Sequence, residues 1–297
     1  MFAKVQKKSY LCKLFAKKLE KMNNFIKRTL SAIVYAGSVI ASILANNPIY
    51  FGTVFMLITA LAIHEHHKLV GASIKSAAYA MATGILLFTT LYFFFAGYEQ
   101  WYWLLFGYLV VLVLAIIHEL FVEQENPIHT WGYLCNSQLM IALPFALMNG
   151  ILLYNKYLLL ALFIVLWVND SGAYIVGSLT GKRKNGNHKM FPRVSPAKSW
   201  EGLIGGFIFD LLAGYIFYKI GWTSDLHLTS YPLLNSLLFA LTIGIFGTLG
   251  DLIESLFKRT LGVKDSGKFL PGHGGVLDRF DSLLLAVPVV YLLFVYL

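Results

Sequence analysis

The chain has 297 residues, of which 58% are hydrophobic and 13% are charged. Soluble domains usually carry about 25% charged residues, so this composition excludes an ordinary water-soluble globular protein. The formal net charge of +9 would suit a nucleic-acid-binding protein, but the basic residues gather in the N-terminal tail and beside apolar stretches. Cys12 and Cys135 give neither a metal-binding spacing nor a disulfide framework. We therefore expect an all-α polytopic membrane protein that binds no nucleic acid.

Residues 1–29 are rich in Lys and Arg and hold one acid, Glu20. Their apolar residues recur at helical spacing, which predicts a basic amphipathic helix on an anionic membrane surface. A solvated, disordered tail is the open alternative. The segment lacks the small-residue cleavage pattern of a signal peptide. Residues 30–297 are expected to form one membrane domain.

The rest of the chain divides into about nine apolar stretches that are long enough to cross a bilayer as helices. They are expected at residues 30–48, 50–66, 76–96, 101–119, 131–149, 156–178, 202–220, 232–256 and 282–297. The fifth is the weakest, since Asn136, Gln138 and Pro144 interrupt it.

Orientation follows from Lys and Arg. With a cytoplasmic N-terminus, every Lys and Arg except Lys156 and Lys219 falls on or beside the cytoplasmic side. This arrangement puts the C-terminus outside and the polar loops 179–201 and 257–281 in the cytoplasm. Residues 165–285 carry nearly all of the polar chemistry.

The first polar cluster lies where the stretch 232–256 reaches the cytoplasm. Asp251, Glu254, Ser255 and Lys258 stand at i, i+3, i+4 and i+7 and therefore share one helix face. Two carboxylates in an apolar span are costly unless they pair or hold a metal. A Glu254–Lys258 ion pair is the plain alternative, but it leaves Asp251 unexplained. The pattern indicates metal or phosphate binding.

The loop that follows contains Pro271-Gly-His-Gly-Gly275. Its glycines allow backbone N–H groups to approach an anion closely, and His273 is a candidate phosphate contact or proton carrier, with a purely structural role also open. Asp278 and Asp281 flank Arg279 at the start of the last helix. The helix dipole alone favours one carboxylate there, whereas two suit a metal site.

Asp170 lies in the inner half of the stretch 156–178, with Gly177 along its face, so another helix could pack closely there. An interhelical hydrogen bond is the alternative to a functional role. The segment His64-Glu-His-His67 resembles a set of metal ligands but lacks a closing partner nearby. We expect it to be an interfacial helix end.

Ser195-Pro-Ala-Lys198-Ser-Trp-Glu-Gly precedes the stretch 202–220. Ser195 is predicted to cap the helix, with Pro196 as its first residue. This would direct a helix N-terminus and Lys198 toward an anion at the cytoplasmic site. A well-capped span without a ligand is the alternative.

Residues 255–281 resemble the signature of the phosphatidate cytidylyltransferases, which are also called CDP-diacylglycerol synthases. The matching positions are Ser255, Lys258, Arg259, Lys264, Asp265, Gly267, Pro271, His273, Gly274, Gly275, Asp278, Arg279 and Asp281. The blocks around Asp170 and Ser195 also resemble this family, so the similarity covers about residues 165–285. The chain departs from the family at Ser178, where a basic residue is usual, and in a longer 182–191 loop.

The resemblance implies an enzyme that converts CTP and phosphatidic acid into CDP-diacylglycerol and pyrophosphate with Mg²⁺, a second cation being left open. It implies a helical protein of the inner or plasma membrane, in contact with membrane lipids, and a homodimer. The residues assigned to catalysis are Asp251, Asp278, Lys258 and Asp281, and those assigned to the metal are Asp251, Asp278, Asp281 and Glu254. The residues assigned to substrate binding are Lys198, Ser195, Ser255, Arg259, Lys264, His273, Gly274, Gly275, Arg279 and Asp170.

Two other functions fit parts of the pattern. A CTP-dependent kinase for an isoprenoid or phytol alcohol also needs CTP and a metal, but it transfers the γ-phosphoryl group and requires a general base. An ion-coupled transporter would use Asp170 and Asp251, but such proteins often have broken helices and repeat symmetry, which this sequence lacks.

Overall fold

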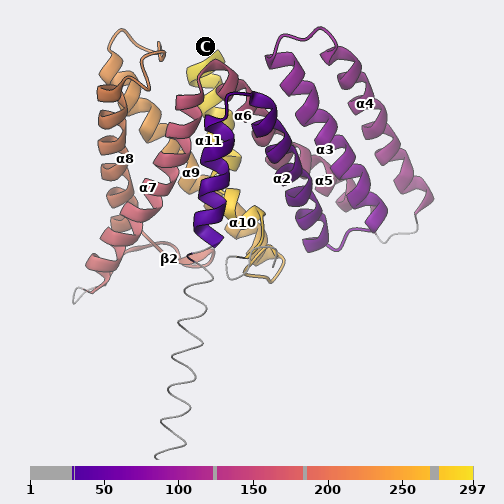
Figure 1. Ribbon diagram of the computed structural model, residues 1–297. Coiled ribbons are helices and arrows are strands. Elements are labelled where there is room, and N and C mark those ends of the chain that lie inside the picture. Colours follow the sequence, from indigo (N-terminus) through magenta and orange to yellow (C-terminus); the bar gives the residue numbers. More distant parts are fainter. Residues whose placement is uncertain (1–28, 30, 123–125, 183–185, 268–273, 297) are drawn as a thin grey trace, which may run out of the picture.

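The computed structural model describes residues 29, 31–122, 126–182, 186–267 and 274–296. These residues form a bundle of helices, as Figure 1 shows. The helices are Ser31–Leu44, α2 (Pro48–Leu69), α3 (Ile74–Phe95), α4 (Trp101–His118), η1 (Glu119–Phe121), α5 (Pro127–Ser137), η2 (Gln138–Ala142), α6 (Leu143–Tyr154), α7 (Lys156–Gly181), α8 (Trp200–Ile220), α9 (Pro232–Thr260), α10 (Leu277–Phe280), α11 (Leu283–Tyr291) and η3 (Leu292–Tyr296). The short strands β1 (Lys189–Phe191) and β2 (Ser195–Ser199) pair antiparallel. The expected all-α class is confirmed, apart from this hairpin.

Seven helices in the described part of the chain are long and apolar enough to cross a membrane. A helix suits this task because it satisfies its own backbone polar groups. The first and last expected spans correspond to the shorter apolar helices Ser31–Leu44 and Leu283–Tyr296. The expected amphipathic helix in residues 1–29 lies almost wholly outside the described residues.

The interrupted span forms one helix from Pro127 to Tyr154 with a wider π-helical turn, η2, at its middle. Pro144 lies just after this turn, and proline cannot donate the usual helical hydrogen bond. Gln138 uses its side-chain amide to donate to the carbonyl of Ala80 on α3, over 3.2 Å. Gln138, one of the residues that weaken the apolar pattern, therefore joins this helix to α3 inside the bundle.

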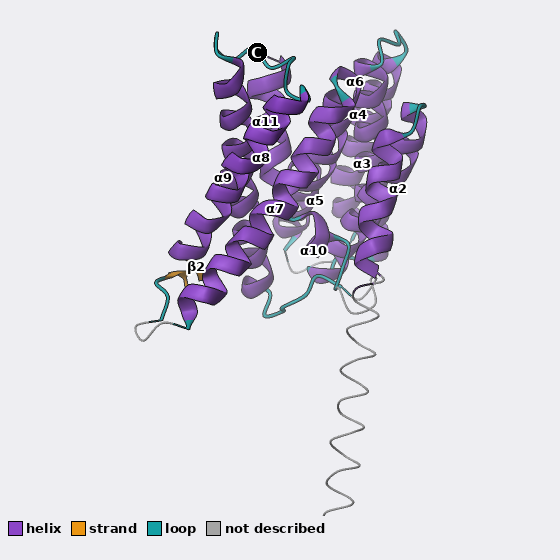
Figure 2. Ribbon diagram, turned by 60° about the vertical axis from the view of Figure 1, so that its left-hand side comes forward, coloured by secondary structure: helices purple, strands orange, loops and turns teal. Residues whose placement is uncertain are grey.

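The short helix α10 is anchored in the aromatic core. The ring centre of Phe280 lies 5.9 Å from that of Phe55 on α2 and 5.2 Å from that of Phe145 on α6. Figures 1 and 2 show α10 and β2 at one end of the bundle, with the chain's C-terminus at the other. The buried ring of Phe280 thus fixes the polar residues beside it at this end.

Candidate functional site

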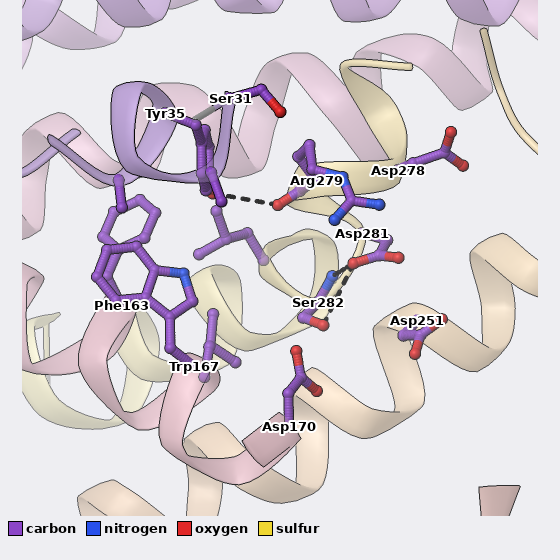
Figure 3. A pocket seen from close by; sticks show the side chains of 14 residues that line it. Ser31, Tyr35, Phe163, Trp167, Asp170, Asp251, Asp278, Arg279, Asp281 and Ser282 are labelled. Atoms are coloured by element: carbon purple, nitrogen blue, oxygen red, sulfur yellow. Dashed lines mark hydrogen bonds between the residues drawn. The ribbon is translucent and has the colours of Figure 1, made fainter. Parts of the chain in front are cut away.

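A cavity of about 440 Å³ lies between the helix Ser31–Leu44, α7, α9 and the segment around α10. Its polar lining includes Asp170, Asp251, Asp278, Arg279 and Asp281. Figure 3 shows the carboxylates of Asp170, Asp251 and Asp281 around one space, with Asp278 directed away beyond Arg279. The structure therefore brings together three acidic clusters that are far apart in the sequence.

The hairpin β1–β2 supplies Lys198 to this group. Its Nζ lies 2.6 Å from Oδ2 of Asp251 and donates to the carbonyl oxygen of Thr248 over 3.4 Å. Ser255 donates its hydroxyl to the other oxygen of Asp251, over 3.2 Å. Asp251 is therefore held between a cation and a hydroxyl group, and both residues were predicted from the sequence to lie at the site.

The prediction that Ser195 caps α8 is wrong. Residues 195–199 are held extended because Phe191 pairs with Ser195 and Lys189 pairs with Ser199 in the hairpin. The cap is Ser199, whose side chain accepts a hydrogen bond from the backbone N–H of Gly202 over 3.1 Å. Lys198 consequently reaches the site from a strand, and Ser195 stands at the far end of that strand.

Lys258 bridges two acidic residues at the end of α9. Its Nζ lies 2.5 Å from Oε2 of Glu254 and 2.6 Å from Oδ1 of Asp278. The side chains of Glu254, Asp278 and Lys258 are only 2%, 6% and 10% exposed. The expected Glu254–Lys258 pair therefore exists, and it extends into a buried triad that ties α9 to α10.

Asp278 is enclosed by donors from the loop between α9 and α10, which we call the signature loop. The backbone N–H of Ser266 donates to both of its oxygens, over 3.1 and 2.9 Å, and that of Gly275 donates to Oδ2 over 2.7 Å. Burial raises the pKa of Asp278, but the hydrogen bonds from Lys258 and from Gly275 lower it by more. The pKa is therefore below its usual value, and the carboxyl group stays ionised. The glycine loop, which we expected to cradle a phosphate, here binds the chain's own carboxylate.

Gly274 explains why a glycine is needed in this loop. Its φ of +85° is a backbone conformation that other L-residues rarely adopt. A Cβ atom there would also press against the carboxylate of Asp278. His273, the other predicted contact in this loop, lies outside the described residues.

Asp281 is crowded by other acids. Burial raises its pKa well above the usual value, and the charges of Asp251 and Glu254 raise it further. Its carboxylate accepts the backbone N–H of Ser282 over 2.7 Å. Carboxyl groups whose pKa is shifted by burial and by neighbouring charges are typical of functional sites.

Within the described ranges, no three His, Cys, Asp or Glu side chains form a group that could hold a metal ion as they stand. Lys198 and Lys258 already neutralise Asp251, Glu254 and Asp278. The chemistry of the donors nevertheless fits a hard divalent cation, which prefers carboxylate oxygens. Oε1 of Glu254 is buried without a hydrogen-bond partner in the described part of the chain, so this oxygen keeps an unused capacity to accept a ligand interaction.

The remaining predicted residues separate into two groups. Arg259 donates to the carbonyl oxygens of Val194 and Val263, over 3.3 and 3.0 Å, and so links α9 to the hairpin and to its own following loop. Lys264 and Arg279 are exposed, and Arg279 lines the cavity. Arg259 is exposed as well, and of these three cations only Arg279 lines the cavity with the acids.

A second cavity, of about 420 Å³, lies between α7, α8 and the hairpin. Asp170 lines both cavities, so it stands where the two spaces meet, and Lys198 lines the second cavity. α7 and α8 approach closely here, since a Cβ on Gly177 would come within 3.7 Å of the Cα of Gly202. The close helix packing expected beside Asp170 is confirmed.

Glu65 of α2 is the candidate that sequence reasoning missed. It belongs to the segment His64–His67, which was interpreted as an interfacial helix end. The segment does end α2, but Glu65, His66 and His67 are buried. A carboxylate inside an apolar stretch was the available signal, yet its partners lie about two hundred residues further along the chain.

Comparison with known proteins finds relatives of this chain. A model of the Cytidylyltransferase family matches residues 26–297. The phosphatidate cytidylyltransferase of Haemophilus influenzae is 34% identical over an alignment of 295 positions, which covers 88% of this chain and 96% of that protein. The enzymes of the same name from Bacillus subtilis and Staphylococcus haemolyticus are 37% and 47% identical, over 62% and 47% of this chain and 66% and 49% of their own lengths. The family match over nearly the whole chain and these relatives show that the chain belongs to the cytidylyltransferase family.

Proposed function

We propose that this membrane enzyme transfers the cytidylyl group of CTP to phosphatidic acid, giving CDP-diacylglycerol and pyrophosphate. The observation that carries this proposal is the cavity in which acids from α7, α9 and the segment after α10 meet Arg279, with Lys198 and Lys258 bound to its rim. Cations that alternate with carboxylates suit two phosphate-bearing substrates and a divalent ion. The matching family model and the names of the relatives described above also support this activity.

The reaction forms one bond and breaks one. A phosphate oxygen of phosphatidic acid bonds to the α-phosphorus of CTP, and the bond from that phosphorus to the oxygen bridging to the β-phosphorus breaks, so pyrophosphate leaves. The attacking phosphate is already an anion, and no covalent enzyme nucleophile is needed. The chain's task is to position the two phosphates and to neutralise their charge, for which Arg279, Lys264 and Lys198 are available.

Asp251 and Asp281, whose carboxylates face the same space, would hold Mg²⁺. Asp278 and Glu254 would join them as ligands once Lys258 releases their carboxylates, and a second cation is left open. When bound, Mg²⁺ would supply positive charge to phosphate oxygens and to the leaving pyrophosphate. Without such a cation, Lys198 and Lys258 balance these acids. The same lysines could turn toward substrate phosphates once the acids gain another partner.

We further propose nine membrane spans in the inner or plasma membrane, with the N-terminus in the cytoplasm. In support, Ser31 at the start of the first apolar helix lines the same cavity as Asp281, which puts the start of that helix on the side of the site. CTP would then enter from the cytoplasm while the lipid tails stay in the bilayer. A homodimer is part of this proposal and is tested by the mass of the purified protein in detergent.

The test uses purified protein and CTP labelled at either the α- or the γ-phosphorus, with phosphatidic acid as the lipid in one reaction and an isoprenoid alcohol in a parallel one. The proposal predicts that the α-label enters the lipid and that the γ-label leaves as pyrophosphate. A γ-label in the lipid, with CDP released, would instead establish an alcohol-type lipid kinase. Label in neither product, from folded protein, would contradict both enzymatic functions.

A further inference from the structure

Glu65 is a buried carboxylate that holds the signature loop from behind. It lies near the end of α2 and is 8% exposed. Its Oε2 accepts the hydroxyl of Ser266 and the backbone N–H of Leu277, each over 2.9 Å. A buried charge is tolerated only when it is well paired with donors, and here two donors come from the loop around Asp278.

Two glycines of the signature make room for this carboxylate. A Cβ atom on Gly267 or on Gly275 would collide with the carboxylate of Glu65. The backbone of the loop therefore passes directly over Glu65 at both points. This close approach gives a physical reason for glycine at both positions that is independent of any bound phosphate.

The donors that Glu65 fixes belong to the same segments that hold Asp278. Ser266 gives its hydroxyl to Glu65 and its backbone N–H to Asp278, while its Oγ also accepts the backbone N–H of Asp278 over 3.3 Å. Leu277, which donates to Glu65, directly precedes Asp278. Glu65 and Asp278 are thus joined through one residue, with Ser266 between them.

We propose that Glu65 is a positioning residue for cytidylyl transfer, which acts by fixing the segments around Ser266 and Leu277 and hence the orientation of Asp278. This proposal rests on the proposed function of the site. Glu65 does not line the cavity that holds the acids, so it acts on the reaction through Asp278. Displacing a catalytic group by about 1 Å can cost on the order of 100-fold in rate.

The test compares Glu65→Ala, Glu65→Gln and Ser266→Ala with a matched pair elsewhere in the bundle. The control is Glu119 of η1, which is also buried and accepts the hydroxyl of Ser76 over 2.7 Å. Glu119→Ala and Ser76→Ala therefore remove the same kind of contact between η1 and α3, which involves neither Ser266 nor Leu277. Each variant is purified, its folded fraction is measured by thermal unfolding, and kcat and KM for CTP are determined per folded enzyme with α-labelled CTP.

We expect Glu65→Ala to lower kcat by about 100-fold with little change in KM for CTP, because the positioned group acts in the transition state. Glu65→Gln keeps an oxygen acceptor and should restore most of kcat. Since Ser266 acts through the same contact, the double variant should lose less activity than the product of the two single losses. The control variants should lower only the melting temperature.

Several results would overturn the proposal. One is a normal kcat for folded Glu65→Ala, and another is a loss per folded enzyme that the Glu119 variant matches. If Glu65→Ala does not fold, a normal kcat for folded Ser266→Ala decides against it. Failure of the wild-type protein to transfer any label would instead refute the proposed function.

Discussion

The buried triad of Lys258, Glu254 and Asp278 allows the sharpest prediction. Lys258→Met keeps the length and apolar stem of the side chain but removes the cation that lies 2.5 and 2.6 Å from the two acids. All three side chains are at most 10% exposed, so the two carboxylates would be left buried without their partner. Breaking a buried ion pair in this way typically costs about 3–5 kcal/mol of stability.

We expect Lys258→Met to lower the free energy of unfolding by about that amount, measured in detergent against denaturant. Adding Glu254→Gln removes one of the stranded charges and should recover part of the loss, which makes the two changes strongly non-additive. Lys75→Met, at an exposed position of α3, is the matched control and should change stability by less than about 0.5 kcal/mol. A Lys258→Met protein as stable as this control, or no recovery in the double variant, would refute the triad as a stabilising unit.

Three further predictions concern the residues around this triad. Asp278→Asn should abolish CDP-diacylglycerol formation while the protein still inserts and folds, and near-normal turnover would remove Asp278 from the catalytic set. Gly274→Ala should reduce turnover strongly, because its positive φ costs about 1–2 kcal/mol in any other residue and the new methyl group would displace Asp278; wild-type rates would contradict this. Ser199→Ala should lower stability by about 1 kcal/mol through loss of the cap on α8, and an unchanged melting temperature would show that another residue caps the helix.

Local patterns in the sequence predicted much of the site. The period of a helix placed Asp251, Glu254 and Lys258 on one face, and the structure pairs two of them directly. The apolar stretches predicted where the helices lie, including the span interrupted at Gln138. These features depend on residues close together in the chain, which is why the sequence alone could reveal them.

The features that were missed depend on tertiary contacts. Ser195 has the local signal of a helix cap, but strand pairing with Phe191 overrides it and moves the cap to Ser199. Glu65 looked like part of a helix end because its partners, Ser266 and Leu277, come from the other half of the chain. Contacts over such separations leave no periodic pattern in the sequence.

The most direct test of the central claim, that the acids of the cavity hold a divalent cation for the reaction, is the Mg²⁺ dependence of cytidylyl transfer. This dependence is compared between the wild type, Asp251→Asn, Asp281→Asn and the control Asp225→Asn. In the wild type, the carboxylate of Asp225 accepts a hydrogen bond from the side chain of Asn155, and neither residue lines the cavity. We expect both cavity variants to need a much higher Mg²⁺ concentration for half-maximal rate, or to lose activity entirely, while Asp225→Asn behaves as the wild type. A Mg²⁺ dependence that is the same in all four proteins would contradict the claim.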